Sequence, residues 1–145
     1  MKISVLGSGA FGTALAISLS TGDNSITLWG RNPKKVIAFS QDRENKDRLP
    51  NYPFPTSLYV TSDFKLACDS DAILIAVPTQ SLRKFIEENH TYLQRRTLIA
   101  CCKGFDMETG KGPVDMLKNV SDQAAILTGP SFANDIARGL PTALT

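Results

Sequence analysis

Three glycines near the N-terminus have the spacing G-x-G-x-x-G, at Gly7, Gly9 and Gly12. An apolar run at residues 3–6 precedes them, and apolar side chains recur at helical spacing over residues 11–19. A strand, a glycine-rich turn and a helix in this order predict a site for the diphosphate of a dinucleotide, although a plain strand–helix turn can show the same spacing. Gly7 would permit the tight turn, Gly9 the approach of the diphosphate, and Gly12 close packing of the helix on the strand.

Arg31 follows the second predicted strand, at the point where such sites distinguish between cofactors. Sites selective for NAD usually carry an acidic residue here for the ribose 2′-hydroxyl, and the segment Trp29-Gly30-Arg31-Asn32 has none. The guanidinium of Arg31 can pair with a 2′-phosphate and stack on adenine. NADP(H) is therefore the favoured cofactor and NAD(H) the other candidate. The alternative is a solvated arginine at a strand end.

Two more candidate residues follow predicted strands. Pro78 comes after the apolar run 72–77 and either terminates that strand or contacts the cofactor. Lys103 comes after the run 97–102 and precedes a glycine. Because ligands bind beyond the carboxyl ends of parallel strands, its ammonium group is placed to bind a phosphate or polarise a carbonyl group. The alternative is a surface lysine.

The segment after the predicted strand 124–128 contains Gly129 and Ser131. Ser131 is expected to cap a short helix that runs to about Gly139. The N-terminus of such a helix would suit an anionic substrate, and simple capping is the alternative.

Short apolar runs alternate with helix-length amphipathic segments along the whole chain. Strands are expected at residues 3–6, 26–29, 59–61, 72–77, 97–102 and 124–128, and helices at 11–22, 32–44, after 78 and at 114–120. This order predicts an α/β fold: a Rossmann-type, doubly wound, mainly parallel sheet with helices on both faces, in one domain over residues 1–145. Residues 45–55 contain three prolines and are expected to form a stiff loop that borders a ligand site or merely crosses the surface.

Composition excludes several classes of protein. The 145 residues carry a net charge of +2, too small a surplus to indicate a nucleic-acid partner. Residues 72–77 are too few to cross a bilayer, and the first residues do not resemble a signal peptide. Three cysteines without C-x-x-C spacing and a single histidine, His90, argue against a disulfide framework or a bound metal. Cys101 and Cys102 are expected to be buried strand residues. We therefore expect a soluble, cytoplasmic protein.

Taken in chain order, these motifs resemble the NAD(P)-dependent glycerol-3-phosphate dehydrogenases of bacteria. The resemblance rests on KISVLGSGAFGTALA, LWGRNP, RLPNYPFP, IAVPTQ, CCKGFDMETG and TGPSFANDIARGLPTA, which run through nearly the whole chain in the family's order. Residues 103–104 together with 129–133 are more specific than the glycine spacing. The resemblance implies reversible hydride transfer between NAD(P)H and dihydroxyacetone phosphate, which gives sn-glycerol 3-phosphate for phospholipid synthesis.

The same resemblance assigns roles to individual residues. The cofactor would contact Ala10, Phe11 and Ala133 besides the three glycines, with Arg31 at its adenosine end; Lys103 would touch cofactor and substrate, and Gly129 and Ser131 would bind the substrate. Two positions depart from the family. Arg48 stands where an aromatic residue is usual, which puts any cofactor contact there in doubt, and Ala10 stands where serine is common, so one hydroxyl contact would be absent.

The family's proton-transfer lysine belongs to a second, helical domain beyond residue 145. We therefore expect this chain to be the N-terminal half of such an enzyme, binding NADP(H) but turning over negligibly alone, because hydride transfer needs a shielded, oriented reaction centre. Two other interpretations stay open: a β-hydroxyacid or 6-phosphogluconate-type dehydrogenase domain, and a non-catalytic module that senses NADP(H). The oligomeric state of the complete enzyme, a homodimer included, is left open.

Overall fold

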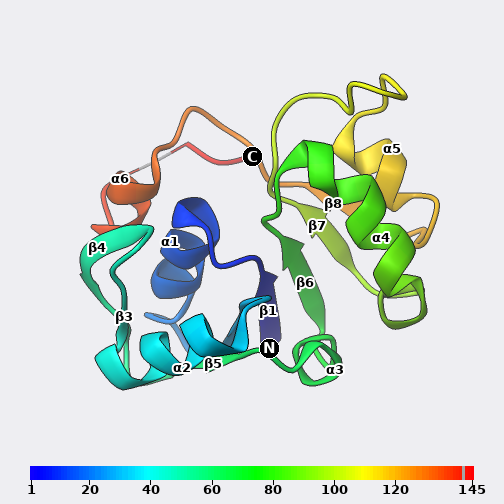
Figure 1. Ribbon diagram of the computed structural model, residues 1–145. Helices are drawn as coiled ribbons and strands as arrows, with labels where there is room; N and C mark the ends of the chain where they lie inside the picture. The colour runs from blue at the N-terminus through cyan, green and yellow to red at the C-terminus, as the bar shows by residue number, and fades with distance from the viewer. Residues whose placement is uncertain (142) are drawn as a thin grey trace.

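Six parallel strands form the central sheet, in the order β5-β2-β1-β6-β7-β8 (Figure 1). The computed structural model describes residues 1–141 and 143–145. The strands are β1 (Lys2–Leu6), β2 (Ser25–Trp29), β5 (Leu58–Thr61), β6 (Ala72–Ile75), β7 (Leu98–Ala100) and β8 (Ala124–Ile126). The strand order reverses next to β1, with β2 and β5 on one side and β6, β7 and β8 on the other. The expected Rossmann-type, doubly wound fold is therefore confirmed.

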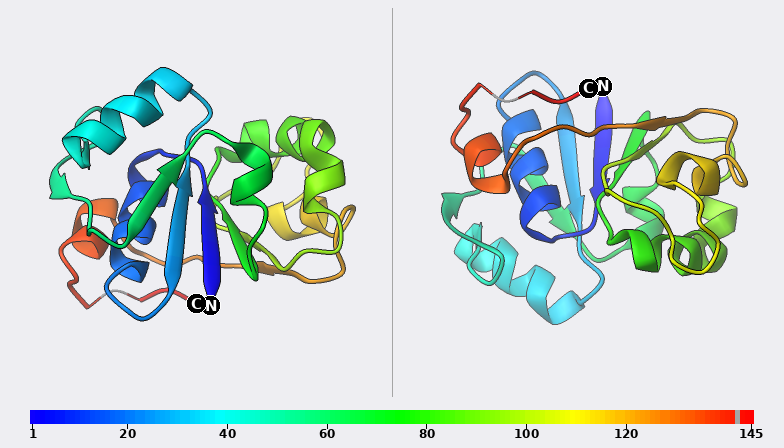
Figure 2. Two further views of the ribbon diagram at one scale, coloured as in Figure 1. Left: turned by 90° about the horizontal axis from the view of Figure 1, so that it is seen from below. Right: turned by 90° about the horizontal axis from the view of Figure 1, so that it is seen from above.

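Helices cover both faces of the sheet (Figure 2). One face carries α1 (Ala10–Leu19), α2 (Pro33–Asp42) and α6 (Ala133–Ala137), and the other α3 (Phe64–Ala67), α4 (Thr79–Leu93) and α5 (Pro113–Leu117). Successive strand residues point to opposite faces, so Val5 lies in the first hydrophobic core and Leu6 in the second. Burial on both faces explains why the strands read as unbroken apolar runs. Within the described ranges, no helix combines the length and the apolar character that a membrane span needs.

Local signals define both ends of α2. The Asn32 side chain accepts hydrogen bonds from amides of the first turn, and Pro33 occupies that turn. Arg43 then adopts a left-handed conformation with φ of 51°, which ends the helix. The predicted end at residue 44 is too late, because Glu44 already begins a strand.

A small second sheet lies beside α1 (Figure 1). Its strands β3 (Glu44–Asn45) and β4 (Leu49–Pro53) pair antiparallel. The prediction of a plain loop over residues 45–55 is therefore wrong in part. Prolines are compatible with an edge strand, where a missing amide hydrogen need not break the pairing, and each strand of a two-stranded ribbon is an edge.

The single-turn helix α3 was not expected from the sequence pattern, because four residues are too few to show helical periodicity. The Asp63 carboxylate caps it by accepting a hydrogen bond from the Leu66 amide at 3.0 Å. The Phe64 ring packs edge-on against Trp29 and Phe85, with ring centroids 5.1 and 5.8 Å away. These contacts join α3 and α4 to the end of β2.

Candidate functional site

The predicted site residues gather at one edge of the sheet. The loops that follow β1, β2, β6, β7 and β8 hold the glycine turn, Arg31, Pro78, Lys103 and Gly129, respectively. Because all six strands are parallel, their carboxyl ends lie at the same edge, the upper one in Figure 1. The strand order reverses between β1 and β6, which is where open α/β sheets bind their ligands.

The three glycines of the turn after β1 have different surroundings. Gly7 has φ of 122°, and a Cβ there would lie 2.6 Å from the Ala76 carbonyl oxygen. A Cβ at Gly12 would lie 2.1 Å from the Gly7 carbonyl oxygen. Both residues must therefore be glycine for the backbone to pack, as predicted. Gly9 has an ordinary φ of −72°, and a Cβ there would meet no atom within 4 Å.

Helix α1 begins directly behind this open space. Gly9 is its N-cap residue, and no side chain caps the helix. The amides of the first turn, including those of Ala10 and Phe11, have no intrahelical acceptors and carry partial positive charge. This arrangement can bind an anion such as a phosphate.

Asn45, a residue of the small β3–β4 sheet, forms a side-chain hydrogen bond with the glycine turn. Its side chain is fully buried, and its amide nitrogen donates to the Ser8 carbonyl oxygen and to the Thr13 hydroxyl, both at 2.9 Å. The sequence pattern allows residues 45–55 either to border a ligand site or to cross the surface, and it does not single out Asn45. No local signal could, because its partners are more than thirty residues away in the sequence.

Arg31 extends from the end of β2, next to the glycine turn. A Cβ at Gly30 would lie 3.1 Å from the Ser8 hydroxyl and 2.8 Å from Val36, so Gly30 lets the two loops approach closely. The Arg31 side chain is exposed, and in the described part of the chain it forms no hydrogen bond or ion pair. The neighbouring Asn32 side chain is occupied in capping α2. Within the described part of the chain, Arg31 is thus a cationic group without a partner, beside the turn.

The structure brings Lys103 and Gly129 together. The Lys103 ammonium group donates to the Gly129 carbonyl oxygen at 2.6 Å. The Lys103 backbone is held in turn by the Thr79 hydroxyl, which donates to its carbonyl oxygen at 2.6 Å. The ends of β6, β7 and β8 are therefore linked through this lysine.

The loop after Lys103 is fixed by side chains of α4, which sequence reasoning missed. Gln80 donates to the Phe105 carbonyl oxygen at 2.7 Å and accepts from the Met107 amide at 3.0 Å. Asp106 is almost completely buried and accepts from the hydroxyl and amide of Thr109 at 2.6 and 3.1 Å. The Thr109 hydroxyl, and further its amide and Arg83, hold the pKa of Asp106 below its ordinary value, although desolvation opposes them.

The segment after β8 departs from the prediction at Ser131. Helix α6 begins at Ala133 with Phe132 as its N-cap residue, and no side chain caps it. Ser131 is wrongly predicted as the cap, because its hydroxyl donates to the Ala143 carbonyl oxygen at 3.1 Å. That same oxygen would lie 2.0 Å from a Cβ at Gly129, so only glycine fits there.

Four other predicted residues lie at helix starts or directly after β7, next to Lys103. Pro78 is the N-cap residue of α4, and Ala133 is the first residue of α6, packed against the α1-side core. Cys101 and Cys102 are buried, as expected, but they are not strand residues, because β7 ends at Ala100. Burial raises the pKa of the Cys101 thiol to about 12 and also raises that of Cys102, so neither is a thiolate near neutral pH.

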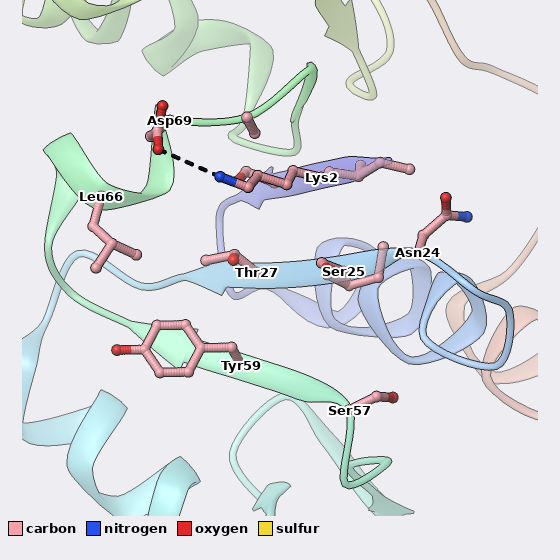
Figure 3. A pocket seen from close by; sticks show the side chains of 12 residues that line it. Lys2, Asn24, Ser25, Thr27, Ser57, Tyr59, Leu66 and Asp69 are labelled. Carbon is pink, nitrogen blue, oxygen red and sulfur yellow. Dashed lines mark ion pairs between the residues drawn. The ribbon is translucent and has the colours of Figure 1, made fainter.

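A separate hollow of about 350 Å³ lies near the amino ends of β1, β2 and β5 (Figure 3). Its lining includes Thr27 and Tyr59, and an ion pair of 3.7 Å between Lys2 and Asp69 crosses it. None of the predicted site residues lines this hollow. The candidate site is instead the open carboxyl edge of the sheet.

Over residues 2–145 the chain matches the family described as the N-terminus of NAD-dependent glycerol-3-phosphate dehydrogenase. The chain belongs to this family. A glycerol-3-phosphate dehydrogenase (NAD(P)+) of Roseobacter denitrificans is 49% identical over 147 residues, which cover all of this chain and 46% of that protein. One from Ruegeria is 50% identical with the same coverage. The crystal structure of glycerol-3-phosphate dehydrogenase from Coxiella burnetii matches 99% of this chain and 45% of its own, with a TM-score of 0.89 and 28% identity.

These matches bear on one of the two other interpretations that the sequence left open. They agree with a glycerol-3-phosphate dehydrogenase domain and give no support to the β-hydroxyacid or 6-phosphogluconate-type interpretation. The chain spans less than half the length of the curated relatives it matches.

Proposed function

We propose that the chain is the dinucleotide-binding domain, residues 1–145, of a glycerol-3-phosphate dehydrogenase. The observation that carries this proposal is the surroundings of Gly9. Neither its φ nor any neighbouring atom requires glycine, and the space before it faces the uncapped start of α1. A diphosphate in that space would accept hydrogen bonds from the amides of the first turn. Family membership supports a nicotinamide dinucleotide as the ligand.

Several residues are proposed to line the path of the cofactor. Its diphosphate lies at the turn of Gly7, Gly9 and Gly12, and contacts the first residues of α1, Ala10 and Phe11. The nicotinamide end extends toward Pro78, Lys103 and Ala133, since these residues follow β6, β7 and β8, on the far side of the strand reversal.

Arg31 is proposed to bind the ribose 2′-phosphate of NADP(H). Three observations support this: β2 ends without an acidic residue, the Asn32 side chain is occupied, and the Arg31 guanidinium has no partner within the described ranges. NAD(H) would bind more weakly, because it lacks the phosphate that an arginine fork can hold.

The substrate of the complete enzyme is proposed to be dihydroxyacetone phosphate or, in reverse, sn-glycerol 3-phosphate. The bound nicotinamide ring would supply or accept the hydride. Lys103 would release the Gly129 carbonyl and bind the substrate through its phosphate or carbonyl oxygen, with the Ser131 hydroxyl beside it. A second, helical domain, in the part of the relatives that this chain does not cover, would enclose the reaction and supply the proton.

The complete enzyme is proposed to act in the cytoplasm. Cys68, Cys101 and Cys102 are all free and buried, an arrangement that suits a reducing compartment.

Calorimetric titration with NADPH and NADH tests the cofactor assignment. Wild-type protein should prefer NADPH, and Arg31→Ala should weaken NADPH binding by about 10- to 100-fold, roughly 1.5–3 kcal/mol, while leaving NADH binding nearly unchanged. Lys34→Ala is the matched control, because it removes an exposed positive charge from the adjacent helix turn and should alter neither affinity much. Equal affinities of the wild type for the two cofactors would refute the role of Arg31, and no binding of either would refute the proposed function.

A turnover assay tests the division into two domains. Oxidation of NADPH by this chain with dihydroxyacetone phosphate should be negligible, and it should appear when the chain is extended to the full length of its relatives. A normal enzymatic rate from residues 1–145 alone would contradict the proposal.

A further inference from the structure

A side chain from outside the glycine turn forms a hydrogen bond with the backbone of the turn. Ser8, its middle residue, has its carbonyl oxygen bonded by the Asn45 side chain, which comes from a strand outside the main sheet. In a trans peptide the carbonyl oxygen and the following amide hydrogen point in opposite directions. Whatever fixes the Ser8 carbonyl therefore also fixes the direction of the Gly9 amide.

The direction set by this bond matters for ligand binding. The Ser8 carbonyl points inward to Asn45, so the Gly9 amide points away from Asn45 and toward the exposed side of the turn. No hydrogen-bond acceptor for this amide is found among the described residues. The open space before Gly9 is the place in which a diphosphate would lie under the proposed function.

The surroundings of Asn45 indicate that its donating nitrogen is the important part. Its side-chain oxygen is buried without a hydrogen-bond partner in the described structure, an arrangement that destabilises the fold. A buried apolar residue would avoid that cost. The nitrogen, by contrast, has two acceptors at 2.9 Å, the Ser8 carbonyl oxygen and the Thr13 hydroxyl.

We infer that Asn45 is a positioning residue for the diphosphate site, acting through the Ser8–Gly9 peptide without touching the cofactor. This inference rests on the proposed function. It assigns a role to the β3–β4 sheet, which lies beside α1 and carries the side chain that orients the turn.

Asn45→Leu tests the inference, because it keeps a similar volume and removes the donor. NADPH affinity should fall at least about tenfold, while the affinity for adenosine 2′-monophosphate, which has no diphosphate, should stay within about twofold of wild type. Thr13→Val is the matched control: it removes the second acceptor of Asn45 but leaves the bond to Ser8, and both affinities should stay near those of wild type. Thermal denaturation of each variant establishes that it is folded.

The outcomes separate the inference from the proposed function. Unchanged NADPH affinity in folded Asn45→Leu overturns the role of Asn45, and so does a parallel loss of both ligands, which indicates general disruption. If Asn45→Leu does not fold, Asn45→Ala is judged by the same ratio of affinities. Wild-type protein that binds neither NADPH nor NADH overturns the proposed function itself.

Discussion

Replacing Gly9 by serine separates the stability of the glycine turn from its capacity to bind a ligand. The φ of −72° is open to any residue, and a Cβ at this position meets no protein atom within 4 Å. Serine is also at least as good an N-cap residue as glycine. We therefore expect Gly9→Ser to change the free energy of unfolding by no more than about 0.5 kcal/mol.

Affinity for NADPH should respond very differently. The serine side chain would occupy the space before α1 in which the diphosphate is proposed to lie. Loss of two charge-assisted hydrogen bonds, at roughly 1.5 kcal/mol each, corresponds to about 100-fold weaker binding. Calorimetric titration measures the affinity, and thermal denaturation of the same sample measures the stability.

Gly12→Ala is the matched control within the same motif. Its Cβ would lie 2.1 Å from the Gly7 carbonyl oxygen, a backbone atom that cannot move aside easily. It should destabilise the protein by about 3 kcal/mol or more. If Gly9→Ser binds NADPH with wild-type affinity, the proposed position of the diphosphate is refuted. If Gly9→Ser is destabilised as severely as Gly12→Ala, the conclusion that a side chain fits at position 9 is refuted.

Two further predictions concern Asp106 and the buried cysteines. The folded-state pKa of Asp106 is lowered, so its stabilising contribution is complete above the unfolded value of about 3.9 and is lost as pH falls through the lower folded value. Urea denaturation from pH 7 to pH 2 should therefore show a constant advantage of wild type over Asp106→Asn above about pH 4.5 that shrinks in stronger acid; an advantage independent of pH would contradict the ionised role. The buried thiols Cys68 and Cys101, with pKa values raised to about 11 and about 12, should not react with Ellman's reagent at pH 8 until the protein is unfolded in guanidinium; rapid reaction of native protein would contradict their burial.

The main sheet could be predicted because its strands are buried on both faces. Runs such as residues 72–77 are apolar throughout, so their positions needed no knowledge of tertiary contacts. Their ends were less certain: this run is a strand only to Ile75, and the run 97–102 only from Leu98 to Ala100. Hydrogen bonding at the sheet edge, rather than apolar character, decides where each strand stops.

The site was predictable where local backbone geometry demands a residue type. Gly12 is required by a contact with Gly7, within one strand–turn–helix unit, and the positive φ of Gly7 is a property of the same unit, so the spacing already indicates both; the contact of Gly7 with the Ala76 carbonyl oxygen is not local. The hydrogen bonds from Asn45 and Gln80 join segments far apart in the sequence, so no spacing of residues in the sequence predicts them. For Ser131 the local signal was misleading. Its residue type and position suit a helix cap, but its hydroxyl donates instead to the carbonyl oxygen of Ala143.

The position of β1 in the middle of the sheet has a consequence for how the protein is made. This strand is synthesised before the other five strands of the sheet, yet one of its two neighbours is β6, whose Ile75 pairs opposite Leu6. Until half of the chain has been synthesised, β1 exposes an unpaired apolar edge, and closing so long a loop makes folding slow. Nascent chains that stop before Ile75 should therefore be prone to aggregate.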